Sequence, residues 1–142
     1  MLRNIELKNF MVSNPARVRA DDNLMDAIHL ILLHRISGVC VVDENDRLIG
    51  MLSELDCLRG ILSATYNDTG IGKVAEFMTA ENLETASPQD HIVGLAADML
   101  SGRKRRLPVV EADGKLVGQI TIRQILRAVK GFSSPANHPK RD

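Results

Sequence analysis

The chain has 142 residues, 44% of them apolar and 25% charged, which is ordinary for a globular protein and argues against wholesale disorder. Eighteen Lys and Arg balance eighteen Asp and Glu, so no general basic surface is expected to attract nucleic acid. No apolar run approaches the roughly 20 residues that span a bilayer, and the opening MLRNIELKNFMV lacks the apolar core of a signal peptide. We therefore expect a cytoplasmic protein without membrane insertion.

The chain contains an internal repeat. Residues 24–60 align with residues 92–128 at a constant offset of 68, with eight identical pairs. From Leu24 and again from Ile92, apolar residues recur at i, i+3, i+4, i+7 and i+8, which marks one face of an amphipathic helix. Upstream the offset is 67, so that Phe10-Met11 matches Phe77-Met78. We predict two packed copies of one small unit, with both methionines covering the core.

In chain order, the first copy predicts strand, helix, strand, strand and helix. A short strand at 16–19 precedes a helix capped by Asp21, Asp22 or Asn23. Apolar runs at 39–42 and 47–52 flank a polar turn at 43–46, as in a hairpin. A last helix carries Leu55, Leu58 and Leu62. We assign repeat 1 to residues 7–62 and a polar, glycine-bearing linker to 63–73.

The second copy predicts the same elements. A strand at 83–86 is followed by a helix with Ser87 as N-cap and Pro88 at its first position. The runs 107–110 and 115–120 flank the turn signal Asp113-Gly114, and a last helix follows. Repeat 2 is assigned to residues 74–130, and residues 131–142, which lack periodicity, to a flexible tail. The predicted fold class is α+β, with a small three-stranded sheet in each repeat and pseudo-two-fold packing.

Each last helix begins with a hydroxyl residue followed three positions later by an acceptor. The stretches are GMLSELD, with Ser53 and Asp56, and GQITIRQ, with Thr121 and Gln124. One interpretation is structural, because a hydroxyl at the N-cap and an acceptor at N3 form a capping box. The other is a ligand contact. The spacing fits both.

Other reactive side chains favour structural roles. The histidines show no metal-ligand spacing, and Cys40 and Cys57 fit small core residues of a reducing compartment. No phosphate loop, nucleophile elbow or paired-acid signature is present. The basic run GRKRR at 102–106 fits either a solvated helix end or phosphate contacts. With so few aromatic residues to stack on bases, nucleic-acid binding is disfavoured. We expect no enzyme, no metal site and no bound cofactor.

Three pairs of stretches resemble the CBS domain, and the duplicated chain looks like a stand-alone Bateman module. They are NFM and EFMT, RISGVCVVDENDRLIG and RKRRLPVVEADGKLVG, and MLSELDCL and QITIRQIL. The resemblance covers residues 7–130. It implies a regulatory module that binds AMP, ADP, ATP, S-adenosylmethionine or NAD between its repeats and reports to a protein in trans, usually as a homodimer.

The resemblance also implies two ligand clefts, each with residues of both repeats. The first would combine Ser53 and Asp56 with Glu81, Asn82, Leu83, Arg105, Arg106 and Leu107. The second would combine Thr121 and Gln124 with Asn14, Pro15, Ala16, Ser37, Gly38 and Val39.

Two residues depart from the family pattern. Cys40 stands where the family usually has Pro, and Gln124 where it usually has Asp. An ionised Asp56 accepts hydrogen bonds from both hydroxyls of a ribose, whereas Gln124 has one acceptor oxygen. We therefore expect the first cleft to bind the ligand and the second to bind weakly, differently or not at all. The alternative function is an interaction scaffold with vestigial clefts.

Overall fold

The computed structural model describes residues 5–132, which form two compact units. The first-repeat unit comprises residues 15–83 together with the turn 113–116, and the second-repeat unit comprises residues 5–14, 84–112 and 117–132. Each unit has its own core of buried apolar side chains. The duplication seen in the sequence therefore corresponds to two cores.

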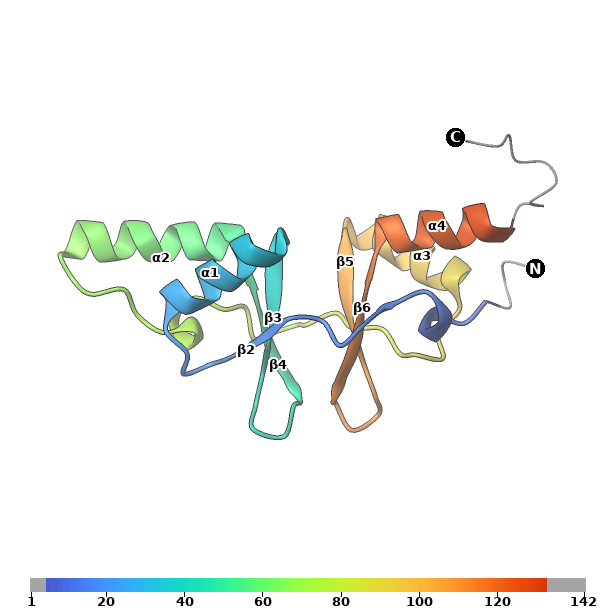
Figure 1. The fold of residues 1–142 in the computed structure, drawn as a ribbon, viewed down its shortest axis with the longest axis horizontal. Coiled ribbons are helices and arrows are strands. Elements are labelled where there is room, and N and C mark those ends of the chain that lie inside the picture. Colours follow the sequence, from blue (N-terminus) through green and yellow to red (C-terminus); the bar gives the residue numbers. More distant parts are fainter. Residues whose placement is uncertain (1–4, 133–142) are drawn as a thin grey trace. The chain divides into compact units, whose positions relative to one another are not determined.

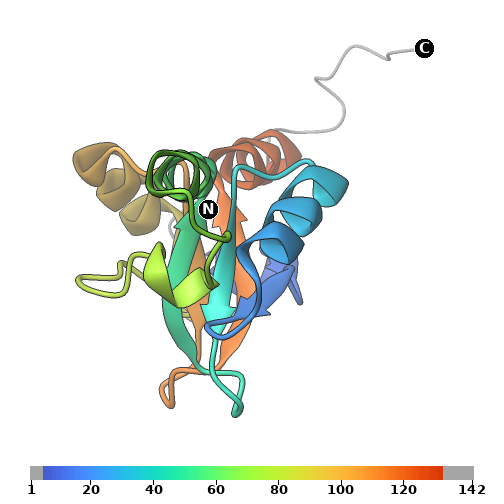
Figure 2. The same ribbon diagram turned by 90° about the vertical axis from the view of Figure 1, so that its left-hand side faces the viewer.

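The first-repeat unit is a three-stranded sheet with helices on one side of it (Figures 1 and 2). Strand β3 is central: it pairs in parallel with β2 and antiparallel with β4. Every residue of β3 is buried. The elements are β2 (Arg17–Arg19), α1 (Leu24–His34), β3 (Gly38–Val42), β4 (Leu48–Ser53), α2 (Glu54–Asn67) and a 3-10 helix (Val74–Glu76).

The second-repeat unit also has a three-stranded sheet, in the order β1-β6-β5, with β1 antiparallel to β6. Its elements are a 3-10 helix (Leu7–Asn9), β1 (Val12–Ser13), α3 (Ile92–Gly102), β5 (Arg106–Val110), β6 (Leu116–Thr121) and α4 (Ile122–Phe132). Each unit therefore has the predicted three-stranded sheet. The third strand of the first-repeat unit is β2, which directly precedes α1 in the chain, whereas that of the second-repeat unit is β1, from the N-terminal segment. This finding confirms the predicted α+β class with a three-stranded sheet in each repeat, and it places part of the N-terminal segment in the second core.

The opening segment of each predicted repeat packs in the unit of the other repeat. Val12 pairs with Gln119 of β6, and Thr79 forms an antiparallel bridge with Met51 of β4. Met11 packs against the second-repeat core and Met78 against the first-repeat core. A Cβ on Gly50 would lie 2.8 Å from the Met78 sulfur, so the glycine leaves room for that side chain.

The strand expected at 83–86 is wrong, because only Ala86 pairs, in a single parallel bridge with Val109. Ala86 N–H donates to Pro108 O at 2.9 Å, and Val110 N–H donates to Ala86 O at 2.9 Å. The next ladder bond towards the start of the segment would need an N–H at Pro108, which proline lacks. Cys40 stands at the equivalent position in β3, where β2 pairs normally.

Helices α1 and α3, which occupy equivalent positions in the two repeats, begin differently. Asn23 is the N-cap of α1, and its side chain accepts a hydrogen bond from Met25 N–H at 2.8 Å, as predicted. The predicted helix start at Ser87-Pro88 is wrong, because α3 begins at Ile92 with His91 as N-cap. Ile92 N–H donates to Ile5 O at 3.1 Å, and the backbones of Glu6 and His91 form an antiparallel β-bridge. The N-terminal segment therefore holds the backbone before α3 in an extended conformation.

The last helices extend further than the sequence indicated. Helix α2 continues through Asn67, into the segment expected to be a linker. Gly131 and Phe132 are the last residues of α4, while residues 133–142 of the expected tail lie outside the described residues. Among residues 5–132, no helix is long and apolar enough to cross a membrane.

Candidate functional site

Helix α2 begins with a complete capping box. Strand β4 ends at Ser53, whose backbone is extended and whose hydroxyl accepts a hydrogen bond from Asp56 N–H at 3.1 Å. In return, Asp56 Oδ2 accepts the Ser53 N–H at 2.9 Å. Glu54 N–H donates to Ser37 O at 3.0 Å, which ties the helix start to the residue before β3. The predicted structural role of the pair is confirmed.

Asp56 is a buried carboxylate that keeps acceptor capacity. The residue is 7% exposed, and its Oδ1 accepts a hydrogen bond from Arg59 Nη1 at 2.9 Å. Each oxygen thus accepts one intramolecular bond, while a carboxylate offers about four acceptor positions. About two positions therefore remain, one on each oxygen, which is the arrangement that a vicinal diol needs. The cap and a ligand contact are compatible at Asp56.

Sequence reasoning missed Arg59. It lies three residues after Asp56 on the same helix, a spacing at which opposite charges meet. The Arg59 side chain is 66% exposed while that of Asp56 is 10% exposed, so the guanidinium lies at the solvent side of the carboxylate. The i,i+3 pairing of Asp and Arg was the available signal.

Helix α4 begins with the neutral version of this box. Gln124 Oε1 accepts the Thr121 N–H at 3.1 Å and also the Thr121 hydroxyl, while Gln124 N–H donates to Thr121 Oγ1 at 3.3 Å. The single acceptor oxygen of Gln124 therefore already takes two intramolecular bonds. As expected, Gln124 closes the cap, and it has less acceptor capacity left than Asp56.

The residues predicted for the first cleft are divided between the units. Ser53, Asp56 and the segment 81–83 belong to the first-repeat unit, and residues 105–107 belong to the second-repeat unit. Glu81 and Asn82 are exposed and Leu83 is half-buried. Arg105 is exposed, Arg106 is half-buried and Leu107 is part of the second-repeat core.

The residues predicted for the second cleft are divided in the same way. Asn14, Thr121 and Gln124 belong to the second-repeat unit, whereas Pro15, Ala16 and the segment 37–39 belong to the first-repeat unit. Asn14 N–H donates to Val117 O at 3.4 Å, and Asn14 is exposed. Pro15 is buried, Ala16 is half-buried, Ser37 is exposed, and Gly38 and Val39 are buried. Ala16 directly precedes Arg17, which pairs with Cys40 of β3, and Val39 directly precedes Cys40.

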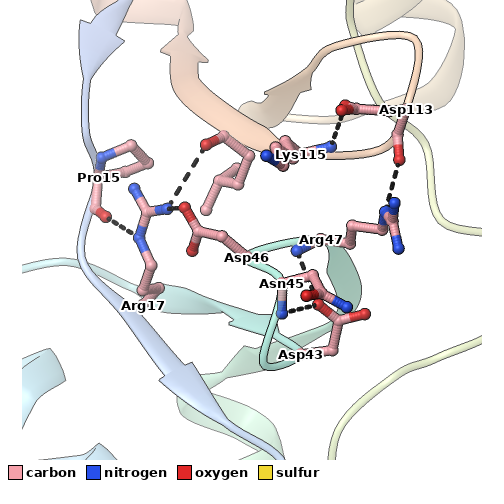
Figure 3. Close-up of polar contacts among 9 residues, drawn as sticks. Pro15, Arg17, Asp43, Asn45, Asp46, Arg47, Asp113 and Lys115 are labelled. Atoms are coloured by element: carbon pink, nitrogen blue, oxygen red, sulfur yellow. Dashed lines mark hydrogen bonds and ion pairs between the residues drawn. The ribbon is translucent and has the colours of Figure 1, made fainter.

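Arg17 anchors the segment that contains Pro15 and Ala16 (Figure 3). Its Nε donates to Pro15 O at 3.1 Å, and its Nη1 lies 2.7 Å from Asp46 Oδ2 and 3.5 Å from Leu116 O. Arg47 Nε donates to Asp113 O at 3.0 Å, which holds the turn 113–116 against the turn of the first hairpin. Arg17 was not singled out from the sequence, since its partners are 29 and 99 residues away.

An apolar groove runs between α1 and α2. It has a volume of about 230 Å³ and is lined by Ile28, Ile31, Leu32, Glu54, Cys57, Leu58 and Ile61. Burial, with the nearby charges of Asp56 and Glu54, raises the pKa of the Cys57 thiol above its ordinary value. The raised pKa disfavours the thiolate, which is the reactive form of cysteine, at neutral pH. Within residues 5–132, no cluster of His, Cys, Asp or Glu is placed to hold a metal ion.

The fold consists of two α+β units that repeat one arrangement of elements, each with a capping box at the start of its last helix. The sequence matches the CBS domain over residues 7–63 and again over 71–131. The chain belongs to the CBS domain family and contains a pair of these domains.

Two kinds of relative are informative. The chain is 39% identical over 121 residues to the inosine-5'-monophosphate dehydrogenase of Aquifex aeolicus (strain VF5), covering 84% of this chain and 24% of the dehydrogenase. It therefore spans about a quarter of the length of that enzyme. It is 27% identical over 135 residues to the chloroplastic CBS domain-containing protein CBSX2 of Arabidopsis thaliana, covering 78% of this chain and 57% of that protein.

A solved structure of CBSX2 was obtained in complex with AMP. It superposes on this chain with a TM-score of 0.79 at 29% identity, covering 91% of this chain and 98% of that one. A structure from Sphaerobacter thermophilus, the CBS domain of a CBS domain-containing membrane protein, gives a TM-score of 0.72 at 30% identity, covering 89% and 88% of the two chains. A paired-domain architecture is thus common to proteins of different overall organisation.

Proposed function

We propose that the chain is a non-catalytic regulatory module that binds an adenosine-containing ligand and modulates a partner protein in trans. The observation that carries the proposal is Asp56: a buried carboxylate at a helix start, with one acceptor position left on each oxygen. Similarity to CBSX2, which binds AMP in its crystal structure, supports an adenine nucleotide as the ligand.

In the proposed site, Asp56 accepts hydrogen bonds from the two ribose hydroxyls. Ser53 stands at the helix N-terminus, where the helix dipole favours an anionic group. Glu81, Asn82, Leu83 and Leu107 border the ligand, and Arg105 and Arg106 supply positive charge for a phosphate. Since these residues come from both units, the assembly of the site is itself part of the proposal.

We further propose a homodimer formed through the helices. Large apolar side chains are exposed on α1 and α2 (Leu32, Leu33, Leu55 and Leu58) and on α3 and α4 (Leu100, Ile122 and Leu126). Together with the apolar groove between α1 and α2, they form surfaces of a kind that proteins bury at interfaces. A second copy of the chain offers the same surfaces, and an isologous contact between copies closes without leaving a free face.

Isothermal titration of the purified protein with AMP, ADP, ATP, S-adenosylmethionine and NAD tests ligand binding. We expect a saturable heat with at least one of them and its loss in Asp56→Ala. Gln124→Ala should change the signal little, because the second cleft is proposed to bind weakly. Absence of heat and of any thermal shift with all five ligands would contradict the proposal.

A second candidate function is an interaction scaffold, and the exposed apolar helices favour it. In that case, co-purification with a partner should be unaffected by nucleotide and by Asp56→Ala. In the regulatory module, addition of the ligand should change partner affinity in the wild type, because the ligand binds two conformations with different affinity. The same addition should have no effect in Asp56→Ala.

A further inference from the structure

Arg59 forms an ion pair with Asp56. Its Nη1 lies 2.9 Å from Asp56 Oδ1, and both residues belong to α2. The geometry of one helix fixes this contact, so it does not depend on any other part of the site. The Arg59 side chain is 66% exposed, so it remains accessible to solvent while it contacts Asp56. A guanidinium has five N–H donors, so most remain available after the contact with Asp56.

We propose that Arg59 selects the charge of the ligand at the Asp56 site. It favours adenosine ligands with an anionic 5' group, is neutral towards uncharged ones, and disfavours cationic ones. This inference rests on the proposed function and deepens it, because it names the ligand class as an adenosine 5'-phosphate. Arg59 thus acts on specificity, while Asp56 holds the ribose.

The reason is electrostatic. Without Arg59, the negative charge of the buried Asp56 would repel a phosphate brought near it by the ribose that Asp56 binds. Unit charges several ångström apart near a protein surface interact strongly enough to change an affinity by a factor of about ten or more. Arg59 cancels this repulsion and offers donors to the phosphate. The diol can still bind, since each Asp56 oxygen retains an acceptor position while Arg59 stays in place.

The opposite effect is expected for S-adenosylmethionine, whose 5' substituent carries a net positive charge. Arg59 repels that group, so removing Arg59 should improve its binding. The uncharged thioether 5'-methylthioadenosine has the same adenosine group but no charged 5' substituent, so removal of Arg59 should change its affinity little. A residue needed only for the stability of α2 would change all three affinities in the same direction.

The second repeat supplies a matched control. Arg127 occupies the position equivalent to Arg59, but the residue three positions before it is the neutral Gln124. Within residues 5–132, no ion pair joins Arg127 to an acidic side chain. Arg127→Gln therefore removes the same exposed side chain from the same type of helix without touching Asp56.

The experiment is isothermal titration of wild type, Arg59→Gln, Arg59→Lys and Arg127→Gln with AMP, 5'-methylthioadenosine and S-adenosylmethionine. For Arg59→Gln we expect about tenfold weaker AMP binding, a change below about threefold for 5'-methylthioadenosine, and tighter S-adenosylmethionine binding. Arg59→Lys should restore most of the AMP affinity because it keeps the charge. The loss for AMP should shrink as salt is raised, and Arg127→Gln should match wild type.

The outcomes separate the two proposals. If wild type binds none of the three ligands, the role of Arg59 in selecting among them is wrong, and the proposed function fails as well only if ADP, ATP and NAD also give no heat. If wild type binds but Arg59→Gln changes every measured affinity by a similar factor, or behaves like Arg127→Gln, only the role of Arg59 is wrong. If wild type binds AMP but neither of the other two ligands, the role of Arg59 is tested by AMP affinity alone. About tenfold weaker binding in Arg59→Gln and its recovery in Arg59→Lys would support the role, and their absence would overturn it.

Discussion

The starts of α2 and α4 solve the same structural problem with different charges. Both helices follow directly from the last strand of their hairpin, and both use a hydroxyl and a side-chain acceptor three residues later. In α2 the acceptor is a buried carboxylate paired with Arg59, and in α4 it is an amide whose oxygen already takes two bonds. The capping role needs only an acceptor, whereas the proposed ligand role needs the charge and the spare positions.

Exchanging the acceptors gives the largest expected effect. Asp56→Gln should keep a cap, as Gln124 does, but weaken adenosyl-ligand binding at least about tenfold, because it removes an ionised acceptor that makes stronger hydrogen bonds. Its free energy of unfolding should fall by no more than about 1 kcal/mol, since the lost ion pair has an exposed arginine. Titration calorimetry and denaturant unfolding on the same samples measure the two effects separately.

The reverse exchange, Gln124→Asp, sharpens the comparison. It should strengthen or create binding in the second cleft, seen as an increased number of sites per chain. Two outcomes would remove the basis for ranking the clefts: equal losses in Asp56→Gln and Gln124→Ala, or full binding by Asp56→Gln.

The next effect concerns the two strand starts. Gly38 begins β3, where an added Cβ would lie 2.9 Å from Leu52 O and 3.3 Å from Ser53 Cα, while the equivalent Arg106 of β5 carries a long side chain. Because the colliding atoms are backbone, Gly38→Ala should cost about 1–3 kcal/mol of unfolding free energy. Gly70→Ala is the control, because no heavy atom lies within 4 Å of its added Cβ. Urea unfolding of both variants would contradict the account if their midpoints agreed.

Much of the fold followed from the sequence because it depends on local patterns. Helical periodicity placed α1 and α3, and turn chemistry placed both hairpins. The errors came from contacts between distant segments. The backbone bridge between Glu6 and His91 keeps the residues before Ile92 out of α3. The strand predicted at 83–86 does not form because Pro108 lacks an N–H.

The candidate site was predictable to a similar degree. Ser53 and Asp56 were identified from their spacing, and the structure shows that they form the cap. Arg59 was not predicted, although it lies three residues after Asp56, because the motif is defined by its hydroxyl and its acceptor and not by a neighbouring cation. Arg17 could not be found from sequence, since its contact with Asp46 depends on the tertiary fold.

A smaller effect compares the starts of α1 and α3. The Asn23 side chain accepts from Met25 N–H, whereas the His91 side chain makes no capping hydrogen bond. Asn23→Ala should therefore lower the free energy of unfolding by about 1 kcal/mol. His91→Ala, at the equivalent position, should change it by less than about 0.5 kcal/mol. Thermal or urea unfolding checks the difference, and equal losses would mean that the cap contributes nothing measurable.

The smallest effect lies in the hairpin turns and depends on pH. Asp43 Oδ1 accepts hydrogen bonds from Arg47 N–H at 2.9 Å and Asn45 N–H at 2.8 Å, and mainly the Arg47 bond holds the pKa of Asp43 below its ordinary value of 3.8. A lowered pKa in the folded state means that the charge stabilises the turn above pH 3.8, and that this stabilisation is lost as pH falls through the folded-state pKa.

Asp43→Asn should therefore be less stable than wild type by a constant amount between about pH 5 and 7, and the gap should close below about pH 4. Urea midpoints measured across this range provide the test. Glu111→Gln is the control at the equivalent turn position, where Asp113 Oδ1 instead accepts the Lys115 N–H at 3.0 Å. The difference in urea midpoint between Asp43→Asn and wild type could instead stay the same down to pH 3. In that case the ionised carboxylate of Asp43 would not be what stabilises the turn of the first hairpin.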